Sequence, residues 1–268
     1  MVDRKLQEKH LVILVKNSGF QFSSTFFPYT SGEIGPYYIN SECVMKNGED
    51  YAEAISDMTK LIISNISYDK KLDRSNNIIS GGESRDWIFS FPVAYQLKAP
   101  HLMIYKDGKM LGPSIDKKYV IHVADLNNEG SSPRDKWVPA IRSSGGTIDN
   151  IFFYVDRMED GVQVMKDLGL ESHSLVPLDN NAWEFLRKSR VVDDNVYKNL
   201  TDRMEDKHAW ALNMLRSDAG IKKLREMVDD PKQCEKVKKI VNNGYPELKD
   251  ELIERVPGIP NTSPFGKI

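Results

Sequence analysis

The sequence has few cysteines, almost no net charge and no long apolar run. Its two cysteines, Cys43 and Cys234, form neither a CxxC pair nor a cluster with histidine, so a disulfide framework and a zinc site are both poorly supported. The 37 basic and 39 acidic residues leave a formal charge of −2, which gives no overall attraction to a nucleic acid backbone or an anionic membrane. Any phosphate-binding site must therefore be local.

The N-terminal segment and the apolar content argue against export and membrane insertion. The first ten residues, MVDRKLQEKH, are charged and lack the apolar core of a secretory signal. No stretch approaches the apolar length of a membrane span. We therefore expect a soluble cytoplasmic protein, and its 268 residues are enough to bury a core without disulfides or a structural metal.

Apolar periodicity in the first two thirds of the chain predicts strands that alternate with helices and loops. Helices are expected at 3–17, 49–66 and 87–97, and short extended segments at 20–40 around a turn at Ser31 and Gly32. Strands are expected at 76–80, 101–106, 119–126, 150–156 and 174–178. This alternation predicts an α/β fold with a mostly parallel sheet flanked by helices, whose sites lie at the carboxyl ends of the strands.

The pattern changes after residue 178, where the strand signals stop and polar helical runs begin. We expect helices from Asp179 or Asn180 to 186, and at 194–215, 221–228, 233–241 and 245–255, followed by a flexible tail at 257–268. The predicted organisation is a domain at 1–178 and a helical extension at 179–268.

One segment, 120–146, has the pattern of a phosphate site. An apolar strand delivers Asp125 to its carboxyl end, and a loop rich in Asn, Gly and Ser leads into a helix. Ser132 is placed to cap that helix, Pro133 suits its first position, and Asp135 completes a capping box. The N–H groups at such a helix start favour an anion. An ordinary capped connection of an α/β fold is the alternative.

The same segment resembles the type I phosphoribosyltransferases. That family places two acidic residues at the end of such a strand, before a short loop that holds the ribose and 5-phosphate of phosphoribosyl pyrophosphate. Val123–Leu126 matches the strand end and Asn127–Ser132 the loop, but Ala124 takes the first acidic position. Glu129 stands where a phosphate-contacting threonine is usual, so it must point away, pair with a cation, or indicate a changed ligand.

The segment from Ser31 to Asn40 is similar to the N-terminal part of orotate phosphoribosyltransferases in particular. There a Ser-Gly turn precedes an aromatic run beside the base, so Tyr37 and Tyr38 are candidate stacking residues. Thr30 replaces the family's lysine. Packing of the tyrosines beneath a loop is the alternative.

Three further segments match the family in order. Ser80, Gly81 and Gly82 follow a strand where the family binds pyrophosphate, and Arg85 adds charge nearby. Residues 105–112 resemble the mobile catalytic loop, with Lys106 and Lys109 retained but Tyr105 and Leu111 in place of arginine and histidine. Arg157 closes a strand, where a guanidinium suits a carboxylate-bearing base. The alternatives are a simple turn for the glycine pair, a solvated turn for residues 105–112, and a surface ion pair for Arg157.

The resemblance implies transfer of ribose-5-phosphate from phosphoribosyl pyrophosphate to orotate in pyrimidine nucleotide synthesis, with Mg2+ as cofactor and a homodimer as the assembly. No protein ligand for the metal is identified. A different base, or a non-catalytic protein that binds nucleotide or phosphoribosyl pyrophosphate, stays open. The candidate residues are Lys106, Lys109 and Asp125 for catalysis; Ser80, Gly81, Gly82, Asp125, Asn128, Glu129, Gly130, Ser131 and Ser132 for phosphoribosyl pyrophosphate; and Tyr37, Tyr38 and Arg157 for the base.

Overall fold

The computed structural model describes residues 2–66 and 77–259. The chain divides into two compact units, one built from residues 1–19 and 40–186 and the other from residues 20–39 and 187–268. The division falls inside helix α6 (Asn180–Lys188), after Leu186. The sequence places a boundary earlier, at Asp179, and assigns residues 20–39 to the first domain.

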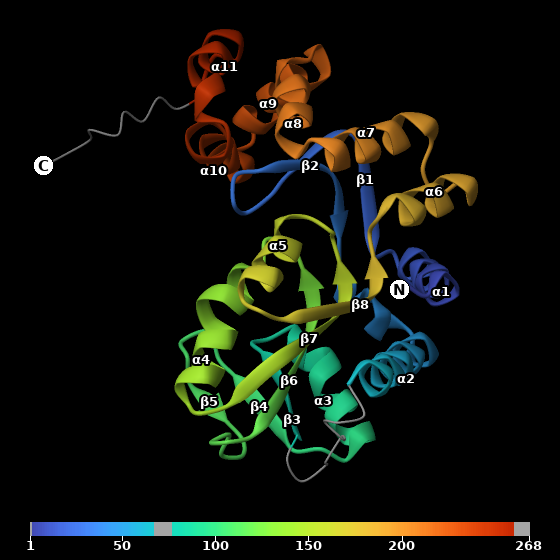
Figure 1. Ribbon diagram of the computed structural model, residues 1–268. Coiled ribbons are helices and arrows are strands. Elements are labelled where there is room, and N and C mark those ends of the chain that lie inside the picture. Colours follow the sequence, from blue (N-terminus) through green and yellow to red (C-terminus); the bar gives the residue numbers. More distant parts are fainter. Residues whose placement is uncertain (1, 67–76, 260–268) are drawn as a thin grey trace, which may run out of the picture. The chain divides into compact units, whose positions relative to one another are not determined.

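A six-stranded sheet forms the centre of the first unit (Figure 1). Its strands lie in the order β5-β4-β3-β6-β7-β8, and every neighbouring pair is parallel except β4 and β5. The strands are β3 (Asn77–Gly82), β4 (His101–Ile104), β5 (Met110–Leu111), β6 (Tyr119–Asn127), β7 (Thr147–Asp156) and β8 (Glu171–Pro177). The predicted α/β fold with a mostly parallel sheet is confirmed.

Helices cover both faces of this sheet. On one face lie α1 (Arg4–Lys16), α2 (Gly48–Asn65) and α3 (Asp86–Leu97), and on the other lie the π-helical turn η3 (Pro133–Trp137), α4 (Val138–Ser143) and α5 (Asp160–Asp167). A 3-10 helix, η1 (Ser41–Lys46), precedes α2. Because both faces are covered, β6 and β7 are buried along most of their length.

Local sequence signals explain where the first helices begin. Asp3 caps α1 by accepting a hydrogen bond from Leu6 N at 3.2 Å, and Asn47 caps α2 by accepting from Glu49 N and Asp50 N at 3.0 Å. The predicted helices at 3–17, 49–66 and 87–97 are confirmed, the last with Pro92 inside it.

The strand order indicates at which edge of the sheet a binding crevice is expected. After β3 the chain crosses by α3 to β4 on one side, whereas β6 lies on the other side of β3 and continues to β7 and β8. In an open parallel sheet, the crevice at such a change of direction lies outside the carboxyl ends of the two strands. Here those ends are Gly82 of β3 and Asn127 of β6.

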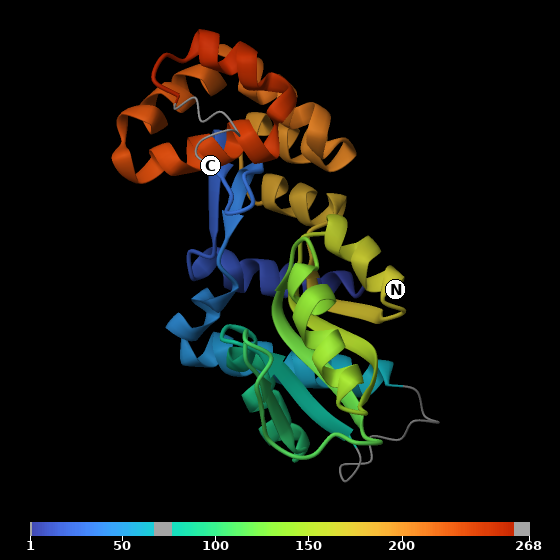
Figure 2. The same cartoon turned by 90° about the vertical axis from the view of Figure 1, so that its left-hand side faces the viewer.

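The second unit combines an antiparallel hairpin with helices that follow much later in the sequence. The hairpin is β1 (Phe20–Pro28) with β2 (Ile34–Ile39), and the turn between them contains Gly32 at φ 99. Figures 1 and 2 show its blue strands lying against the orange and red helices. These are α7 (Asp194–Glu205), α8 (Lys207–Arg216), α9 (Asp218–Asp229), α10 (Pro231–Lys239) and α11 (Lys249–Arg255), with the short turns η4 (Ile240–Gly244) and η5 (Pro246–Leu248).

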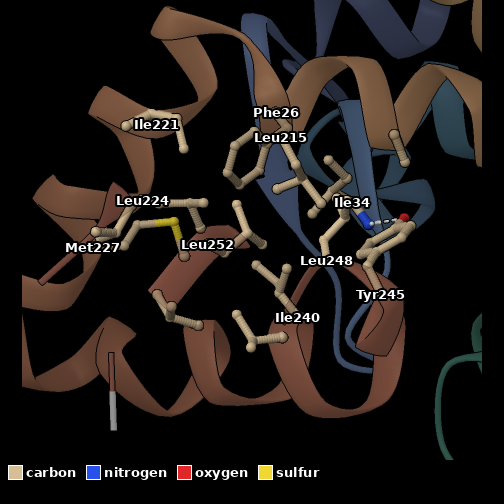
Figure 3. Close-up of a cluster of buried hydrophobic side chains, with 14 of the residues drawn as sticks. Phe26, Ile34, Leu215, Ile221, Leu224, Met227, Ile240, Tyr245, Leu248 and Leu252 are labelled. Carbon is tan, nitrogen blue, oxygen red and sulfur yellow. Dashed lines mark hydrogen bonds between the residues drawn. The ribbon is translucent and has the colours of Figure 1, made fainter. Parts of the chain in front are cut away.

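The hairpin and these helices share one apolar core (Figure 3). Phe26 of β1 and Ile34 of β2 are buried among helical side chains that include Leu215 and Leu252. The hydroxyl oxygen of Tyr245 accepts a hydrogen bond from Ile34 N at 3.2 Å, the contact dashed in Figure 3. Segments far apart in the sequence thus form a single packed unit.

One predicted helix of this unit is two. The sequence suggests a continuous helix at 194–215, but Asp206 has extended backbone angles, φ −148 and ψ 97, and separates α7 from α8. Its carboxylate accepts a hydrogen bond from Ala209 N at 2.8 Å, so the residue acts as the cap of α8. Apolar periodicity alone does not register such a break because both helices keep the same pattern.

Two predicted segments extend beyond the described residues. Asn76, the first residue of one predicted strand, and residues 260–268 of the predicted tail lie outside them. Among the helices of the described residues, none combines the length and the apolar character needed to span a membrane.

Candidate active site

A pocket of about 320 Å³ lies at the carboxyl ends of β3 and β6, within the first unit. The predicted site residues Lys106, Asp125 and Ser132 line it. The remaining lining residues are Glu83, Ser84, Arg85, Asp86, Ala124, Leu126, Pro133, Trp137 and Phe153. The structure therefore brings together Lys106 from one predicted motif with Asp125 and Ser132 from another, at the edge that the strand order indicates.

Asp125 occupies the end of β6 and is 8% exposed. Its Oδ2 accepts a hydrogen bond from Ser41 Oγ at 2.7 Å. Burial, followed by the negative charge of Asp86, raises the pKa of Asp125 from 3.8 to about 7. A carboxyl group in a cleft with a pKa this far from its ordinary value is typical of a functional residue.

Asp86 is a second carboxylate of the pocket, and the sequence analysis missed it. It is the first residue of α3, is also 8% exposed, and its Oδ1 accepts a hydrogen bond from Asp125 N at 3.2 Å. Its Oδ2 accepts from Gly82 N at 2.9 Å. An acidic residue four positions after the glycine pair is the signal that could have identified it.

The glycine pair at the end of β3 is required by close packing. A side chain at Gly81 would lie 2.2 Å from Ser90 Oγ, and one at Gly82 would lie 2.3 Å from the Trp137 ring. Ser80 is buried and its hydroxyl is 2.9 Å from Nδ1 of His122. The three predicted pyrophosphate residues thus lie on the buried strand end, next to the pocket, and their contact with a ligand stays a prediction.

The loop after β6 enters a helix as predicted, but through a different cap. Gly130 has φ 68 and its carbonyl oxygen accepts a hydrogen bond from Arg134 N at 3.1 Å. Ser132 is already helical, with φ −64 and ψ −48, and makes no side-chain capping bond. The predicted capping box is therefore wrong, because Asp135 forms two hydrogen bonds with Arg134 instead, at 2.7 and 2.9 Å.

The N–H groups of this loop remain a candidate anion nest. The helix begins at Ser131, directly after the left-handed Gly130, which leaves the first N–H groups of the helix without helical partners. Asn128 uses its carbonyl oxygen to accept from Gly161 N at 2.8 Å. Glu129 is half-buried. The pKa of Arg134 is raised chiefly by Asp135 and also by the charge of Glu129, which favours pairing with a cation among the three alternatives for this residue.

The two predicted lysines differ in position. Both belong to the turn between β4 and β5, which is closed by the hydrogen bond from Tyr105 N to Lys109 O at 2.8 Å. Lys106 lines the pocket, and its N–H donates to Glu83 Oε2 at 2.9 Å. Lys109 Nζ lies 5.8 Å from the centre of the Tyr105 ring, and this residue is not among those that line the pocket.

The predicted base-binding residues are distributed over both units. Arg157 follows β7 in the first unit, is 7% exposed, and forms an ion pair with Glu159 at 2.9 Å. Tyr37 and Tyr38 are neighbours on β2 in the second unit. Adjacent side chains of a strand point to opposite faces, so only one tyrosine can stack on a given ligand. Tyr38 is 43% exposed, whereas Tyr37 is 3% exposed.

Metal binding by the protein alone is not supported in residues 2–66 and 77–259. No group of three or more histidine, cysteine, aspartate or glutamate side chains in this part of the chain is arranged to hold an ion. Mg2+ ordinarily uses only one or two carboxylates together with substrate phosphates and water. Glu83, Asp86 and Asp125 supply hard oxygen atoms of that kind at the pocket, so the residues suit an ion that arrives with a phosphorylated ligand.

Comparison with known proteins gives relatives of one enzyme class, although no family model matches the chain. An orotate phosphoribosyltransferase of Staphylothermus marinus is 29% identical over 222 residues, covering 78% of this chain and 100% of the relative. An adenine phosphoribosyltransferase of Butyrivibrio fibrisolvens is 27% identical over 150 residues, covering 54% of this chain and 73% of the relative.

Solved structures share the fold. UMP synthase of Leishmania donovani has a TM-score of 0.64 at 16% identity and covers 74% of this chain, which in turn spans 42% of that protein. Orotate phosphoribosyltransferase of Francisella tularensis has a TM-score of 0.58 at 16% identity, with 73% and 97% of the two chains covered. The relatives and the structural neighbours are phosphoribosyltransferases, which confirms the predicted class of enzyme. In sequence the chain is similar to orotate phosphoribosyltransferases, and its fold is that of the solved phosphoribosyltransferase structures.

Proposed function

We propose that this protein transfers ribose-5-phosphate from phosphoribosyl pyrophosphate to orotate. The observation that carries the proposal is the pocket at the β3 and β6 ends, where the buried Asp125 and the helix start at Ser132 line one cavity. A carboxylate beside a loop of free N–H groups suits a phosphorylated sugar, because it provides an acceptor for hydroxyl groups and donors for phosphate.

Each pocket residue has a role that follows from its chemistry. Asp125 would accept a hydrogen bond from the ribose and stabilise positive charge on the sugar as its bond to pyrophosphate breaks. The N–H groups from Gly130 to Ser132 would hold the 5-phosphate. Lys106, which lines the same pocket, would neutralise charge that develops on the departing pyrophosphate.

Mg2+ belongs to the proposal as a companion of the donor. Its protein contacts would come from the pocket carboxylates, Glu83, Asp86 and Asp125. When bound, it would neutralise negative charge on the pyrophosphate oxygens. We further propose that the protein is a cytoplasmic homodimer. Light scattering of the purified protein tests the oligomeric state.

Arg157 is the proposed contact for the carboxylate of orotate. Arg157 directly follows β7, which pairs with the strand that carries Asp125, and a guanidinium can form two parallel hydrogen bonds to a planar carboxylate. Arg157→Ala should raise the KM for the base and leave the affinity for phosphoribosyl pyrophosphate unchanged. Equal loss of both would contradict this role.

The direct test is pyrophosphate release from phosphoribosyl pyrophosphate and Mg2+ in the presence of orotate. Release that depends on orotate, and that Asp125→Asn reduces sharply, supports the proposal. Asp135→Asn is the matched control, because this exposed carboxylate pairs with Arg134 and does not line the pocket. Binding of the donor without release would instead support the non-catalytic alternative.

A different base is the second candidate, and the adenine phosphoribosyltransferases among the sequence relatives favour testing it. The same assay with adenine and a panel of other bases separates the two. Release with adenine and none with orotate would keep the class of reaction and change the acceptor.

A further inference from the structure

Two carboxylates from different elements meet at the pocket. Asp125 comes from the end of β6 and Asp86 from the first turn of α3, and each is 8% exposed. Two backbone N–H groups hold Asp86, one from Gly82 at 2.9 Å and one from Asp125 at 3.2 Å. The carboxylate of Asp86 is thereby fixed by both strand ends that border the pocket.

These hydrogen bonds require acceptor oxygens but not a second negative charge. A buried carboxylate next to another is electrostatically unfavourable, and Asp86 Oδ1 lies only 3.2 Å from the backbone N of Asp125. A ligand that donates hydrogen bonds to both groups would relieve this repulsion. Paired acidic groups in a cleft are therefore more typical of ligand binding than of structural support.

A buried histidine directed at the pair is an independent observation. His122 is 0% exposed and its Nδ1 contacts Ser80 Oγ at 2.9 Å. Its Nε2 lies 3.5 Å from Asp86 Oδ2 and has no hydrogen-bond partner within the described part of the chain. Buried polar atoms without partners are rare. A movement of Asp86 by roughly half an ångström would bring the two atoms into hydrogen-bond distance.

We propose that Asp86 and Asp125 bind two adjacent hydroxyl groups of the donor's ribose, one hydroxyl group each. Ala124 brings no charge to the end of β6, and Asp86 at the start of α3 is the carboxylate that lies beside Asp125 in the pocket lining. Each ribose hydroxyl donates one hydrogen bond, and a carboxylate is the strongest acceptor for it. This inference rests on the proposed function, because it assigns a residue to the sugar that the pocket would hold.

The test compares three sugars by calorimetry without metal: ribose 5-phosphate, 2-deoxyribose 5-phosphate and 3-deoxyribose 5-phosphate. The wild-type protein should bind each deoxy sugar on the order of 10- to 100-fold more weakly, as expected for loss of a hydrogen bond to a charged group. Asp86→Asn should lose its discrimination against one deoxy sugar and keep it against the other. Asp125→Asn should show the opposite pattern.

A structural role for Asp86 gives a different result. Asp86→Asn would then weaken the binding of all three sugars by the same factor, or of none, and either outcome overturns the inference. If Asp86→Asn does not fold, Asp86→Ser provides the same comparison, because its hydroxyl group still accepts an N–H bond. Asp135→Asn should retain all three affinities, since its carboxylate is 53% exposed and pairs with Arg134.

The result also separates this inference from the proposed function. If the wild-type protein binds neither these sugars nor phosphoribosyl pyrophosphate, the proposed function fails and the inference fails with it. If it binds them and Asp86→Asn keeps both discriminations, only the role of Asp86 is refuted.

Discussion

Asp125→Asn should stabilise the folded protein at alkaline pH, although it should impair donor binding. The folded state holds the carboxyl group of Asp125 in a buried position beside Asp86, which raises its pKa to about 7 from 3.8. Between these two values the folded state binds a proton that the unfolded state has lost. The free energy of unfolding therefore decreases as pH rises from about 4 to 7 through this one group.

The magnitude follows from the interval between the two pKa values. Each pKa unit corresponds to about 1.4 kcal/mol, and the two pKa values differ by roughly 3 units. The ionisation of Asp125 therefore lowers the free energy of unfolding by about 4 kcal/mol above pH 7, and it has no effect below pH 3.8. Between pH 5 and pH 8 the change is about 2–3 kcal/mol. Asparagine matches the protonated form in shape and cannot ionise, so the variant should not show this loss.

Urea denaturation of both proteins at pH 5 and pH 8, without metal, measures the effect. His10 and His101 also make stability depend on pH in this range, because burial lowers the pKa of each in the folded state to about 4, whereas the value is 6.5 in the unfolded chain. They are present in both proteins, so their contributions cancel in the difference. The stability of the variant relative to the wild type should increase by about 2–3 kcal/mol from pH 5 to pH 8. A difference that does not depend on pH would refute the assignment of a raised pKa to Asp125.

Four other substitutions test three separate parts of the structure. Lys106→Ala should lower kcat of the proposed reaction on the order of 10- to 100-fold, because Lys106 lines the pocket. Lys109→Ala should change kcat less than about 3-fold, and similar losses in the two variants would contradict this distinction. Gly130→Ala should lower the free energy of unfolding by about 1–3 kcal/mol in urea titrations, because the φ angle of Gly130 is 68 and the new methyl group would lie 2.9 Å from Val164. An unchanged denaturation midpoint would count against this left-handed conformation of Gly130. Leu252→Ala, at a position that is 0% exposed, should cost roughly 2–5 kcal/mol in the same assay, and a cost under about 1 kcal/mol would argue against the core in Figure 3.

The central sheet could be predicted because its strands are buried on both faces. In strands such as β6 and β7 the length of the continuous apolar run indicates where the strand begins and ends. Polar residues such as Asp125 and Asp156 mark the carboxyl edge. The hairpin at 20–39 was also expected as extended segments around Gly32. Its partnership with helices after residue 187 was not, because pairing between distant segments leaves no local periodicity.

The pocket could be predicted where its lining residues belong to continuous sequence motifs. Asp125, Ser132 and Lys106 were identified in this way and line one pocket. Asp86 and His122 were missed, because their importance arises only when α3 and β6 lie next to each other. The predicted capping box failed because Asp135 has an immediate neighbour, Arg134, which binds its carboxylate more readily than a distant backbone N–H does.

The way in which the second unit is assembled limits how the chain can be shortened. Phe26 and Ile34 contribute to a core whose other members follow residue 209. Cutting the chain after residue 178 would leave the hairpin with these two side chains in water, and expressing the helices alone would leave a hole where the hairpin belongs. A functional dissection of this protein should therefore rely on point substitutions, since neither fragment would report the properties of the part that it represents.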